Sequence, residues 1–232
     1  MFLTAVIFAR GGSKGLKNKN LLKIGNVSLL GHSITQAKKM GIFNRIFVST
    51  DNKKIALEAT KYGAEVPFLR PKSLAKDNSP EIYSWRHFIN FIKKNLKLSP
   101  DYVVSLPATS PLRSINDVKK CVNKAKRESL DMVFAITPSS KNPFFNMVKI
   151  KKKKIELICN NKNIYFNRQK APICFDLTTV CYVFKPIFVM NNLNLLSGKT
   201  GFVKISKESS IDIDDFIDYK ISKLLMKNKS NL

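Results

Sequence analysis

The stretch LTAVIFARGGSKGLKNKN, residues 3–20, decides how the rest of the chain is interpreted. Its first seven residues form a short, continuous apolar run that ends at a glycine cluster, which is typical of a buried parallel strand. Gly11, Gly12 and Gly15 then fall within five positions. Glycine permits backbone angles closed to other residues, so successive N–H groups can turn toward an anion. The sequence therefore predicts a strand followed by an anion-binding loop.

The side chains of this loop suit a polyphosphate. They comprise several cations, a hydroxyl donor and an amide able to pair with a base edge: Arg10, Ser13, Lys14, Lys17, Lys19 and Asn20. The loop matches neither the GxxxxGK[ST] pattern nor the GxGxxG pattern of known nucleotide sites. On composition alone, a solvated basic turn remains an alternative to a nucleotide site.

The residues beyond the loop alternate between helical and extended patterns. Helices are expected at 28–39, 55–62, 79–96, 114–127 and 215–226, and strands at 45–50, 65–69, 102–106, 131–137 and 180–184. Such alternation is typical of an α/β fold with three layers, in which helices cover both faces of a mostly parallel, Rossmann-like sheet. Ligands of such sheets bind at the carboxyl ends of the strands, where the 10–20 loop lies.

Three serines are expected to cap helices. Ser28 and Ser114 precede apolar helical periodicity, and Ser79 stands before Pro80 at the expected first helical position. Within the helix that follows Ser79, Trp85 and Phe88 fall on one apolar face. Both are therefore expected in the core and not on a base-stacking platform.

Length and charge bound the class of protein. With 232 residues, 44% of them hydrophobic, the chain can form one α/β domain over residues 1–232 with an elaboration. Its 41 Lys and Arg against 16 Asp and Glu give a net charge of +25, which suggests nucleic acid or an anionic membrane surface. The abundance of Lys, Asn and Ile along the whole chain favours a compositional origin of this charge. We therefore expect no specific nucleic-acid partner, no membrane association and a cytoplasmic location.

The four cysteines do not form a recognisable site. Cys121, Cys159, Cys174 and Cys181 lack CxxC spacing and a nearby histidine pair. Neither a zinc site nor a disulfide framework is indicated, and reduced core thiols are expected.

The alternation breaks between residues 138 and 176. Residues 147–150 and 155–159 predict a hairpin around the lysine-rich tip 151–154. Four lysines at such a tip are more simply a solvated turn than a binding patch.

The last candidate residues along the sequence are a pair of carboxylates. Asp212 and Asp214 lie two residues apart in SIDIDD, so in an extended segment both side chains face the same way. Two such carboxylates can hold a hard cation such as Mg²⁺ together with substrate phosphates. On spacing alone, the same aspartates could instead cap the closing helix.

The opening ARGGSKGxKNKN resembles that of the acylneuraminate cytidylyltransferases, which make CMP-activated nonulosonic acids. Four later segments resemble the same family: RPKSLAKD at 70–77, TSPLR at 109–113, RQKAP at 168–172 and SIDIDD at 210–215. The resemblance implies a nucleotide-diphospho-sugar transferase type of fold, with CTP and a nonulosonic acid as substrates. It also implies a homodimer in which residues 138–176 project and pack against a second subunit.

The resemblance further implies a role for each matching residue. The expected catalytic residues are Lys19, Arg168 and Arg10, with Lys19 stabilising the α-phosphate. The expected nucleotide-binding residues are Arg10, Gly11, Gly12, Ser13, Lys14, Lys19, Asn20, Arg70 and Ser79. Thr109, Ser110 and Arg168 are expected to bind the sugar acid, and Asp212 and Asp214 to bind Mg²⁺.

Two departures indicate which acceptor to expect. Sialate-type members commonly carry Gln-Pro where this chain has Pro107-Ala108, and an arginine and an Asn-Gly pair near Asp176. These differences favour the branch that resembles legionaminate cytidylyltransferases. A ketodeoxyoctonate-type synthetase is an alternative, although Thr-Arg is usual there where this chain has Lys14-Gly15. A basic RNA-binding module is a second alternative, but no aromatic-interleaved basic motif supports it.

Overall fold

In a computed structural model of the chain, residues 1–13, 15–159 and 165–229 are described, and their centre is a six-stranded sheet. Its strands are β1 (Leu3–Phe8), β4 (Arg45–Ser49), β5 (Tyr102–Ser105), β6 (Met132–Pro138), β9 (Phe175–Phe184) and β10 (Thr200–Lys204). The helices are α1 (Leu29–Met40), α2 (Lys53–Lys61), α3 (Glu81–Asn95), α4 (Ile115–Arg127), α5 (Pro186–Asn191) and α6 (Phe216–Lys229). Two short antiparallel pairs complete the described elements: β2 (Lys23–Ile24) with β3 (Val27–Ser28), and β7 (Val148–Lys151) with β8 (Lys154–Leu157).

The central sheet is mostly parallel, in agreement with the sequence prediction. Its order is β10-β6-β9-β5-β1-β4, and β1 pairs in parallel with both β4 and β5. β9 is the exception, because it runs antiparallel between β5 and β6. A register shift between Phe134 and Ile136 marks an irregularity in the β6–β9 pairing.

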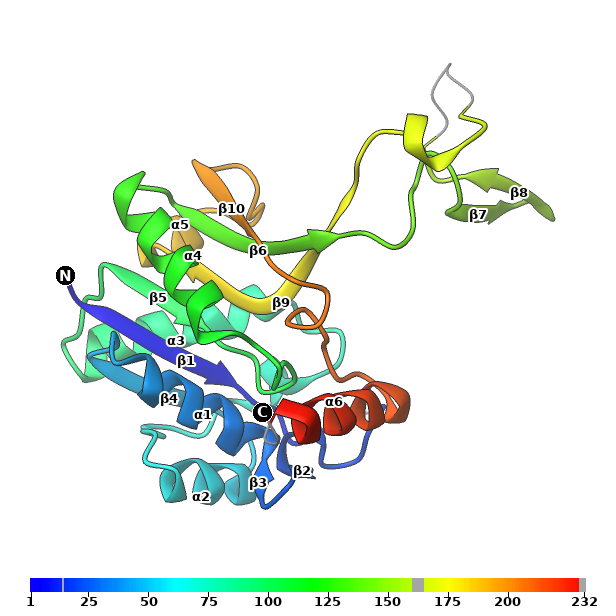
Figure 1. Cartoon of the computed structure of the whole chain (residues 1–232). Coiled ribbons are helices and arrows are strands. Elements are labelled where there is room, and N and C mark those ends of the chain that lie inside the picture. Colours follow the sequence, from blue (N-terminus) through cyan, green and yellow to red (C-terminus); the bar gives the residue numbers. More distant parts are fainter. Residues whose placement is uncertain (14, 160–164, 230–232) are drawn as a thin grey trace.

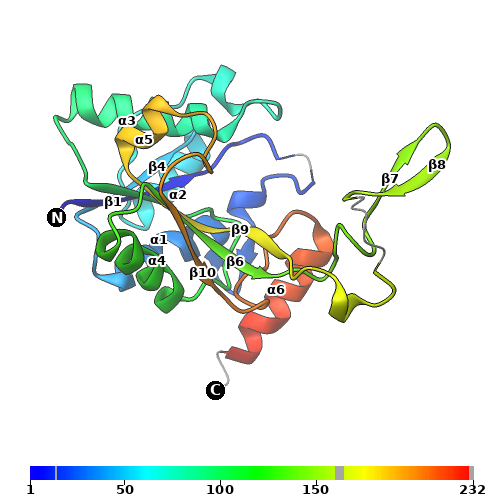
Figure 2. The same cartoon turned by 90° about the horizontal axis from the view of Figure 1, so that it is seen from above.

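Helices cover both faces of this sheet and form the outer layers (Figure 1). Helices α1, α2 and α4 supply buried side chains to one core cluster, and α3 and α5 supply them to the cluster on the opposite face. Figure 2 shows α3 and α5 on one side of the sheet and α1 and α4 on the other. The three-layer prediction is therefore confirmed.

Helix α3 shows how the sequence pattern becomes packing. Trp85 and Phe88 are almost fully buried, and the Trp85 ring stacks on Phe184 of β9 with centroids 4.7 Å apart. This confirms the prediction that both are core residues. The predicted helix start is wrong, however, because α3 begins at Glu81 with Pro80 at the cap position and no side-chain cap bond.

The structure also tests the predicted serine caps, the strand predicted at 65–69 and the state of the cysteines. Ser28 caps α1, since its Oγ accepts a hydrogen bond from the Gly31 N–H at 3.0 Å. Ser114 occupies the cap position of α4 but makes no such bond. The strand predicted at 65–69 is wrong: only two isolated bridges form there, from Glu65 to Phe47 and from Leu69 to Thr50. The four cysteines are free thiols, with Cys121 and Cys181 buried and the other two partly exposed.

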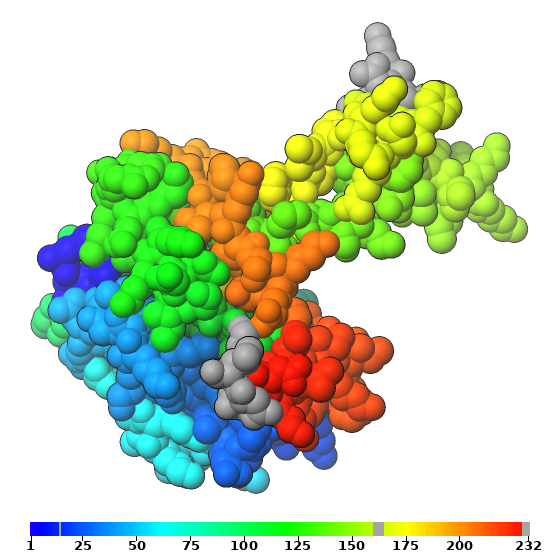
Figure 3. Space-filling view, in the orientation of Figure 1, coloured from blue at the N-terminus to red at the C-terminus, as the bar shows by residue number. Residues whose placement is uncertain are grey.

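Between β6 and β9 the chain leaves the body of the protein. The space-filling view shows this segment projecting as an arm (Figure 3). The predicted hairpin is confirmed as β7 and β8, and its tip residues Lys152 and Lys153 both have positive φ. Elsewhere, the described helices include none with the length and apolar character needed to cross a membrane.

Candidate active site

The glycine-rich loop begins where β1 ends and is fixed by the segment after the neighbouring strand β4. The Gly11 N–H donates to Asp51 Oδ1 at 2.9 Å. A Cβ at Gly11 would lie 2.7 Å from Asn52 Nδ2, so a larger residue would force these two segments apart. Parallel strands β1 and β4 bring both segments to the same edge of the sheet, as the sequence predicts.

The far side of the loop touches the segment that carries the candidate metal ligands. A Cβ at Gly15 would overlap the backbone carbonyl oxygen of Asp214. This glycine is needed for close backbone approach and not for a positive φ. Ser13 and Gly15 line the recess described below, whereas the predicted contact of Lys14 lies outside the described residues.

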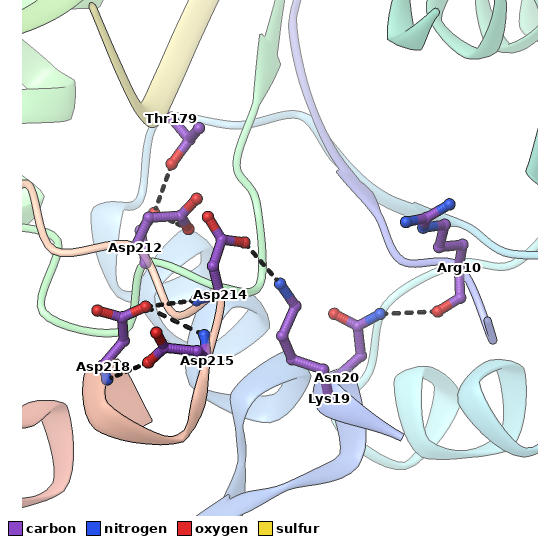
Figure 4. A network of polar contacts seen from close by, with 9 residues as sticks. Arg10, Lys19, Asn20, Thr179, Asp212, Asp214, Asp215 and Asp218 are labelled. Carbon is purple, nitrogen blue, oxygen red and sulfur yellow. Dashed lines mark hydrogen bonds and ion pairs between the residues drawn. The ribbon is translucent and has the colours of Figure 1, made fainter. Parts of the chain in front are cut away.

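Lys19 links the loop to Asp214 directly. Its Nζ lies 3.0 Å from Asp214 Oδ1, and the contact joins residues from opposite ends of the chain (Figure 4). The neighbouring Asn20 is buried, and its Nδ2 donates to the Arg10 carbonyl at 2.9 Å. That bond uses the amide donor of Asn20 for the loop, which leaves the side-chain oxygen as the group available to a base.

The four aspartates between residues 212 and 218 divide into two pairs with different tasks. Asp218 Oδ2 accepts from the N–H groups of Asp214 and Asp215, and Asp215 Oδ1 accepts from those of Ile217 and Asp218. Asp215 and Asp218 therefore cap α6, while the Asp214 carboxylate points toward Lys19 and the Asp212 carboxylate lies beside it (Figure 4). The capping alternative for the Asp212 and Asp214 side chains is thereby excluded.

The chemistry of this donor set fits Mg²⁺. Two carboxylates face the same space, the Asp214 side chain is 78% exposed, and the Lys19 ammonium already occupies a cation position beside it. The described residues contain no group of three or more metal-ligating side chains. Substrate oxygens would have to complete the coordination, which is the usual mode for Mg²⁺.

The turn after β5 connects these aspartates to the sheet. Ser110 Oγ lies 3.2 Å from Thr179 Oγ1 and donates to Asp212 Oδ1 at 3.4 Å, and the Thr109 carbonyl accepts from the Ile213 N–H at 2.8 Å. The structure thus brings Thr109, Ser110 and Asp212 together as predicted. Thr179 was missed, because only the antiparallel placement of β9 brings it beside Ser110.

Buried Arg113 supports this turn from below. It is 3% exposed, and its guanidinium donates to the carbonyls of Val180 and Pro107 and to Ser33 Oγ. Burial lowers the pKa of Arg113 to about 10. A basic residue at the end of TSPLR resembles a surface cation in the sequence, so this buried role had no signal there.

Two adjoining recesses open at this edge of the sheet. The first, of about 430 Å³, is lined by residues that include Arg10, Ser13, Lys19, Thr109 and Asp214. The second, of about 210 Å³, shares Phe8, Arg10 and Asp77 with the first, and Arg70, Ser79, Glu81 and Ser84 also line it. A polyphosphate and a nucleoside would need two connected spaces of this kind.

The cations of the second recess are held by neighbouring groups. Arg10 NH1 lies 2.6 Å from Asp77 Oδ1. Arg70 is 5% exposed and donates from NH1 to Ser84 Oγ at 3.2 Å, while its Nε finds no partner among the described residues. Burial lowers the pKa of Arg70, against the opposing effect of the Asp51 and Glu81 carboxylates. An orphaned buried N–H in a recess is a donor available to a ligand.

Arg168 is not brought to this cleft within one chain. It lies in a short 3-10 helix of the projecting arm, where its NH2 donates to the Ser139 carbonyl at 2.7 Å. The recess around it is lined by arm residues and shares none with the recess at Lys19. Its predicted catalytic and sugar-binding roles therefore stay predictions.

Comparison with known proteins identifies the family of this site. The profile of the cytidylyltransferase family matches residues 4–185. The chain is a cytidylyltransferase. It is 33% identical over 228 residues to flagellin modification protein B of Campylobacter coli, covering 98% of this chain and 96% of that protein. It is equally similar, over the same shares, to the CMP-N,N'-diacetyllegionaminic acid synthase of Campylobacter jejuni, and 31% identical to that of Legionella pneumophila, covering 97% of each.

Solved structures agree on the fold of this cytidylyltransferase. A CMP:2-keto-3-deoxy-manno-octonic acid synthetase complexed with CTP superposes with a TM-score of 0.73 at 14% identity, covering 99% of this chain and 100% of that one. A 4-diphosphocytidyl-2C-methyl-D-erythritol synthase from Anaerococcus prevotii gives 0.68 at 13% identity, covering 97% and 98%. Nucleotidyl transfer needs positioned cations around phosphates more than it needs a dedicated base. The cleft offers such cations in Lys19 and Arg10, and the loop adds backbone N–H groups as neutral donors.

Proposed function

We propose that this cytidylyltransferase transfers CMP from CTP to the anomeric hydroxyl of a nonulosonic acid of the legionaminate type and releases pyrophosphate. One observation carries the proposal: a glycine-rich loop, Lys19 and the Asp212–Asp214 pair converge from opposite ends of the chain on one recess. The names of the full-length relatives from Campylobacter and Legionella support the acceptor class.

CTP occupies both recesses in this proposal. Its phosphates lie on the loop, where Gly12 and Ser13 offer donors and Lys19 meets the α-phosphate, while the Gly11 N–H holds the loop to Asp51. Its nucleoside lies in the adjoining recess, where the buried Arg70 and its unpartnered Nε face a base or ribose acceptor. Binding of the phosphates requires Arg10 to exchange its ion pair with Asp77 for a phosphate oxygen.

Asp212 and Asp214 would hold Mg²⁺. When bound there, the ion offsets charge that develops on the phosphate oxygens. The two carboxylates are held ready for it, because Ser110 fixes Asp212 and Lys19 fixes Asp214.

In the reaction, the anomeric oxygen of the acceptor forms a bond to the α-phosphorus. The bond from that phosphorus to the bridging oxygen of pyrophosphate breaks, and the hydroxyl proton leaves to solvent. Lys19 offsets the added negative charge on the α-phosphate as the bond changes occur. The turn with Thr109 and Ser110 borders the same recess and would orient the acceptor.

The acceptor assignment draws on residues that differ from the sialate pattern. Pro107 provides no side-chain amide, and its carbonyl is already used by Ser33 Oγ at 3.0 Å and by Arg113. Asp176 lies near the start of β9, where it pairs with Thr137 of β6. A carboxylate at this position cannot bind the acceptor's own carboxylate as an arginine would, so another cation has to bind that group.

We further propose that the active protein is a homodimer acting in the cytoplasm, where CTP is available. The arm of one chain would reach the cleft of its partner, so that Arg168 of the partner subunit meets phosphate or sugar carboxylate. Support comes from the position of Arg168, far from its own cleft, and from the apolar side chains that the arm exposes.

The proposal is tested by pyrophosphate release from CTP and Mg²⁺ with a panel of acceptors. The panel contains N,N'-diacetyllegionaminate, its pseudaminate isomer, N-acetylneuraminate and ketodeoxyoctonate. We expect the fastest release with the legionaminate. Faster release with ketodeoxyoctonate would show that the acceptor belongs to that class instead. No pyrophosphate release with any of the four acceptors, in a protein that binds CTP, would refute the proposed acceptor class.

A further inference from the structure

Glu81 places a carboxylate between the nucleoside recess and a third hollow. As the first residue of α3, it lines the 210 Å³ recess together with Arg70 and Ser84. It also lines an apolar hollow of about 310 Å³ beside Trp85 and Tyr182. Neither the loop motif nor the four later segments of the sequence drew attention to it.

The carboxylate of Glu81 is surrounded by protein but not shut off from solvent. Its residue remains exposed, yet the protein atoms around it raise the pKa of the carboxyl, and Asp212 adds to this rise. Arg70 and the Trp85 indole N–H act in the opposite direction. Among the described residues Glu81 forms no ion pair, and it lines the recess beside Arg70.

The position of Glu81 indicates which part of a nucleotide it meets. The recess that Glu81 and Arg70 line adjoins the recess at Lys19, since Phe8, Arg10 and Asp77 line both. The ribose carries the α-phosphate on its 5′ carbon, so the ribose is the part of the nucleoside nearest to the Asp212 and Asp214 pair. The exocyclic amine of cytosine lies at the far end of the base.

Resting on the proposed use of CTP, we propose that Glu81 accepts hydrogen bonds from the ribose 2′- and 3′-hydroxyls and thereby selects ribonucleotides over deoxyribonucleotides. A vicinal diol presents two donors to the two oxygens of one carboxylate. Acidic residues hold the ribose hydroxyls of dinucleotides in the same way. Deleting one hydroxyl leaves a carboxylate oxygen without its charge-assisted bond.

The chemistry also predicts an opposing effect of the charge. A carboxylate near a triphosphate repels it, so removing Glu81 strengthens the binding of any nucleotide that lacks the diol. The diagnostic quantity is therefore the ratio of affinities for CTP and its deoxy analogues, and not the affinity for CTP alone.

The experiment measures the binding of CTP, 2′-deoxy-CTP, 3′-deoxy-CTP and UTP to the full chain by calorimetry, with Mg²⁺ and without acceptor. We expect the wild-type protein to bind CTP about tenfold or more tightly than either deoxy analogue. Glu81→Ala should reduce this preference to about threefold or less, because alanine cannot accept the hydrogen bonds of the ribose hydroxyls. Glu128→Gln removes the same charge at the C-terminal end of α4, outside the two recesses of the cleft, and should keep the wild-type preference.

Three results would overturn the inference. The first is a wild-type protein that binds CTP and its deoxy analogues equally. The second is a Glu81→Ala variant that relaxes the preference for CTP over UTP instead, which would place Glu81 at the base. The third is unchanged nucleotide binding with a raised KM for the acceptor. Pyrophosphate release by the wild-type protein is scored separately, so the cytidylyltransferase proposal can stand when this one fails.

Discussion

The cleft and the arm of this protein differ in how their side chains are paired: the cleft pairs charged groups, whereas the arm exposes apolar ones. In the cleft, cations are already matched by acids: Lys19 by Asp214 and Arg10 by Asp77. In the arm, apolar side chains face water, with Ile150 82% and Ile155 73% exposed. Within one chain, the cations of the cleft are in place to exchange their carboxylate partners for the phosphates of a nucleotide. In the proposed dimer, the second chain covers the arm.

The size of the apolar effect supports this contrast. Burying one isoleucine side chain contributes about 1.5–3 kcal/mol. The arm exposes further large apolar side chains, among them Val148, Phe166 and Ile173. The ion pairs of the cleft are partly exposed and contribute less than about 1 kcal/mol each to stability. Their value is in positioning charge and not in holding the fold.

The largest expected effect comes from breaking the cleft at Lys19. Lys19→Ala removes the cation beside Asp214, and we expect kcat to fall by about a hundredfold to a thousandfold. Circular dichroism and the melting temperature should remain close to those of the wild type, because the ion pair of Lys19 with the exposed Asp214 carboxylate contributes little to stability. Lys54→Ala on α2 is the matched control. Turnover within a few-fold of wild type in Lys19→Ala would remove this residue from catalysis.

The next effect comes from breaking the arm. A double variant, Ile150→Asp with Ile155→Asp, places two charges on its apolar face. We expect the mass measured by light scattering to fall from dimer to monomer, with turnover lost while CTP binding persists. Leu57→Asp is the control, because Leu57 is 73% exposed on α2 of the body. A monomeric wild-type protein with full turnover would contradict the role of the arm.

A smaller effect comes from altering the fit between loop and metal segment. In Gly15→Ala, the added methyl group meets the Asp214 carbonyl, so one of the two segments must shift. We expect about tenfold weaker CTP binding and a loss of about 1–3 kcal/mol of stability. Gly12→Ala is the comparison, since no atom lies within 4 Å of its added Cβ. Equal behaviour of the two variants would show that the close approach is unimportant.

The smallest expected effect concerns the Glu81 carboxylate, whose negative charge in the cleft lowers the stability of the folded chain. The raised pKa of Glu81 means that the folded chain binds more protons than the unfolded chain between the ordinary carboxyl pKa and the raised one. Stability therefore falls as the pH rises through that window. Glu81→Gln should melt slightly higher than wild type at neutral pH, with the difference vanishing in acid. A lower melting temperature at neutral pH would contradict the sign.

The sequence predicted those features whose cause is local. The continuous apolar run of β1 and the glycines after it located the loop, and the carboxyl-edge rule placed it beside the segment after β4. The alternation of strands and helices predicted the three layers. Spacing predicted that Asp212 and Asp214 face the same way, although the assignment of the helix cap to Asp215 and Asp218 needed the structure.

Features with distant causes were not predictable. β9 runs antiparallel between β5 and β6, because the chain returns from the arm in the opposite direction. That return alone places Thr179 beside Ser110. The start of α3 shifted past Ser79, and this shift turns Glu81 into the first helical residue, at the border of two hollows. The spacing of apolar residues along the sequence predicts neither the place of Thr179 nor the first residue of α3.

The most direct test of the central claim follows the phosphates of CTP. CTP radiolabelled at the α-phosphorus and CTP radiolabelled at the γ-phosphorus are each incubated with the protein, Mg²⁺ and N,N'-diacetyllegionaminate. The account predicts the α label in a sugar nucleotide and the γ label in pyrophosphate, in equal amounts. The γ label on the sugar, or the α label in free CMP without a sugar nucleotide, would contradict it.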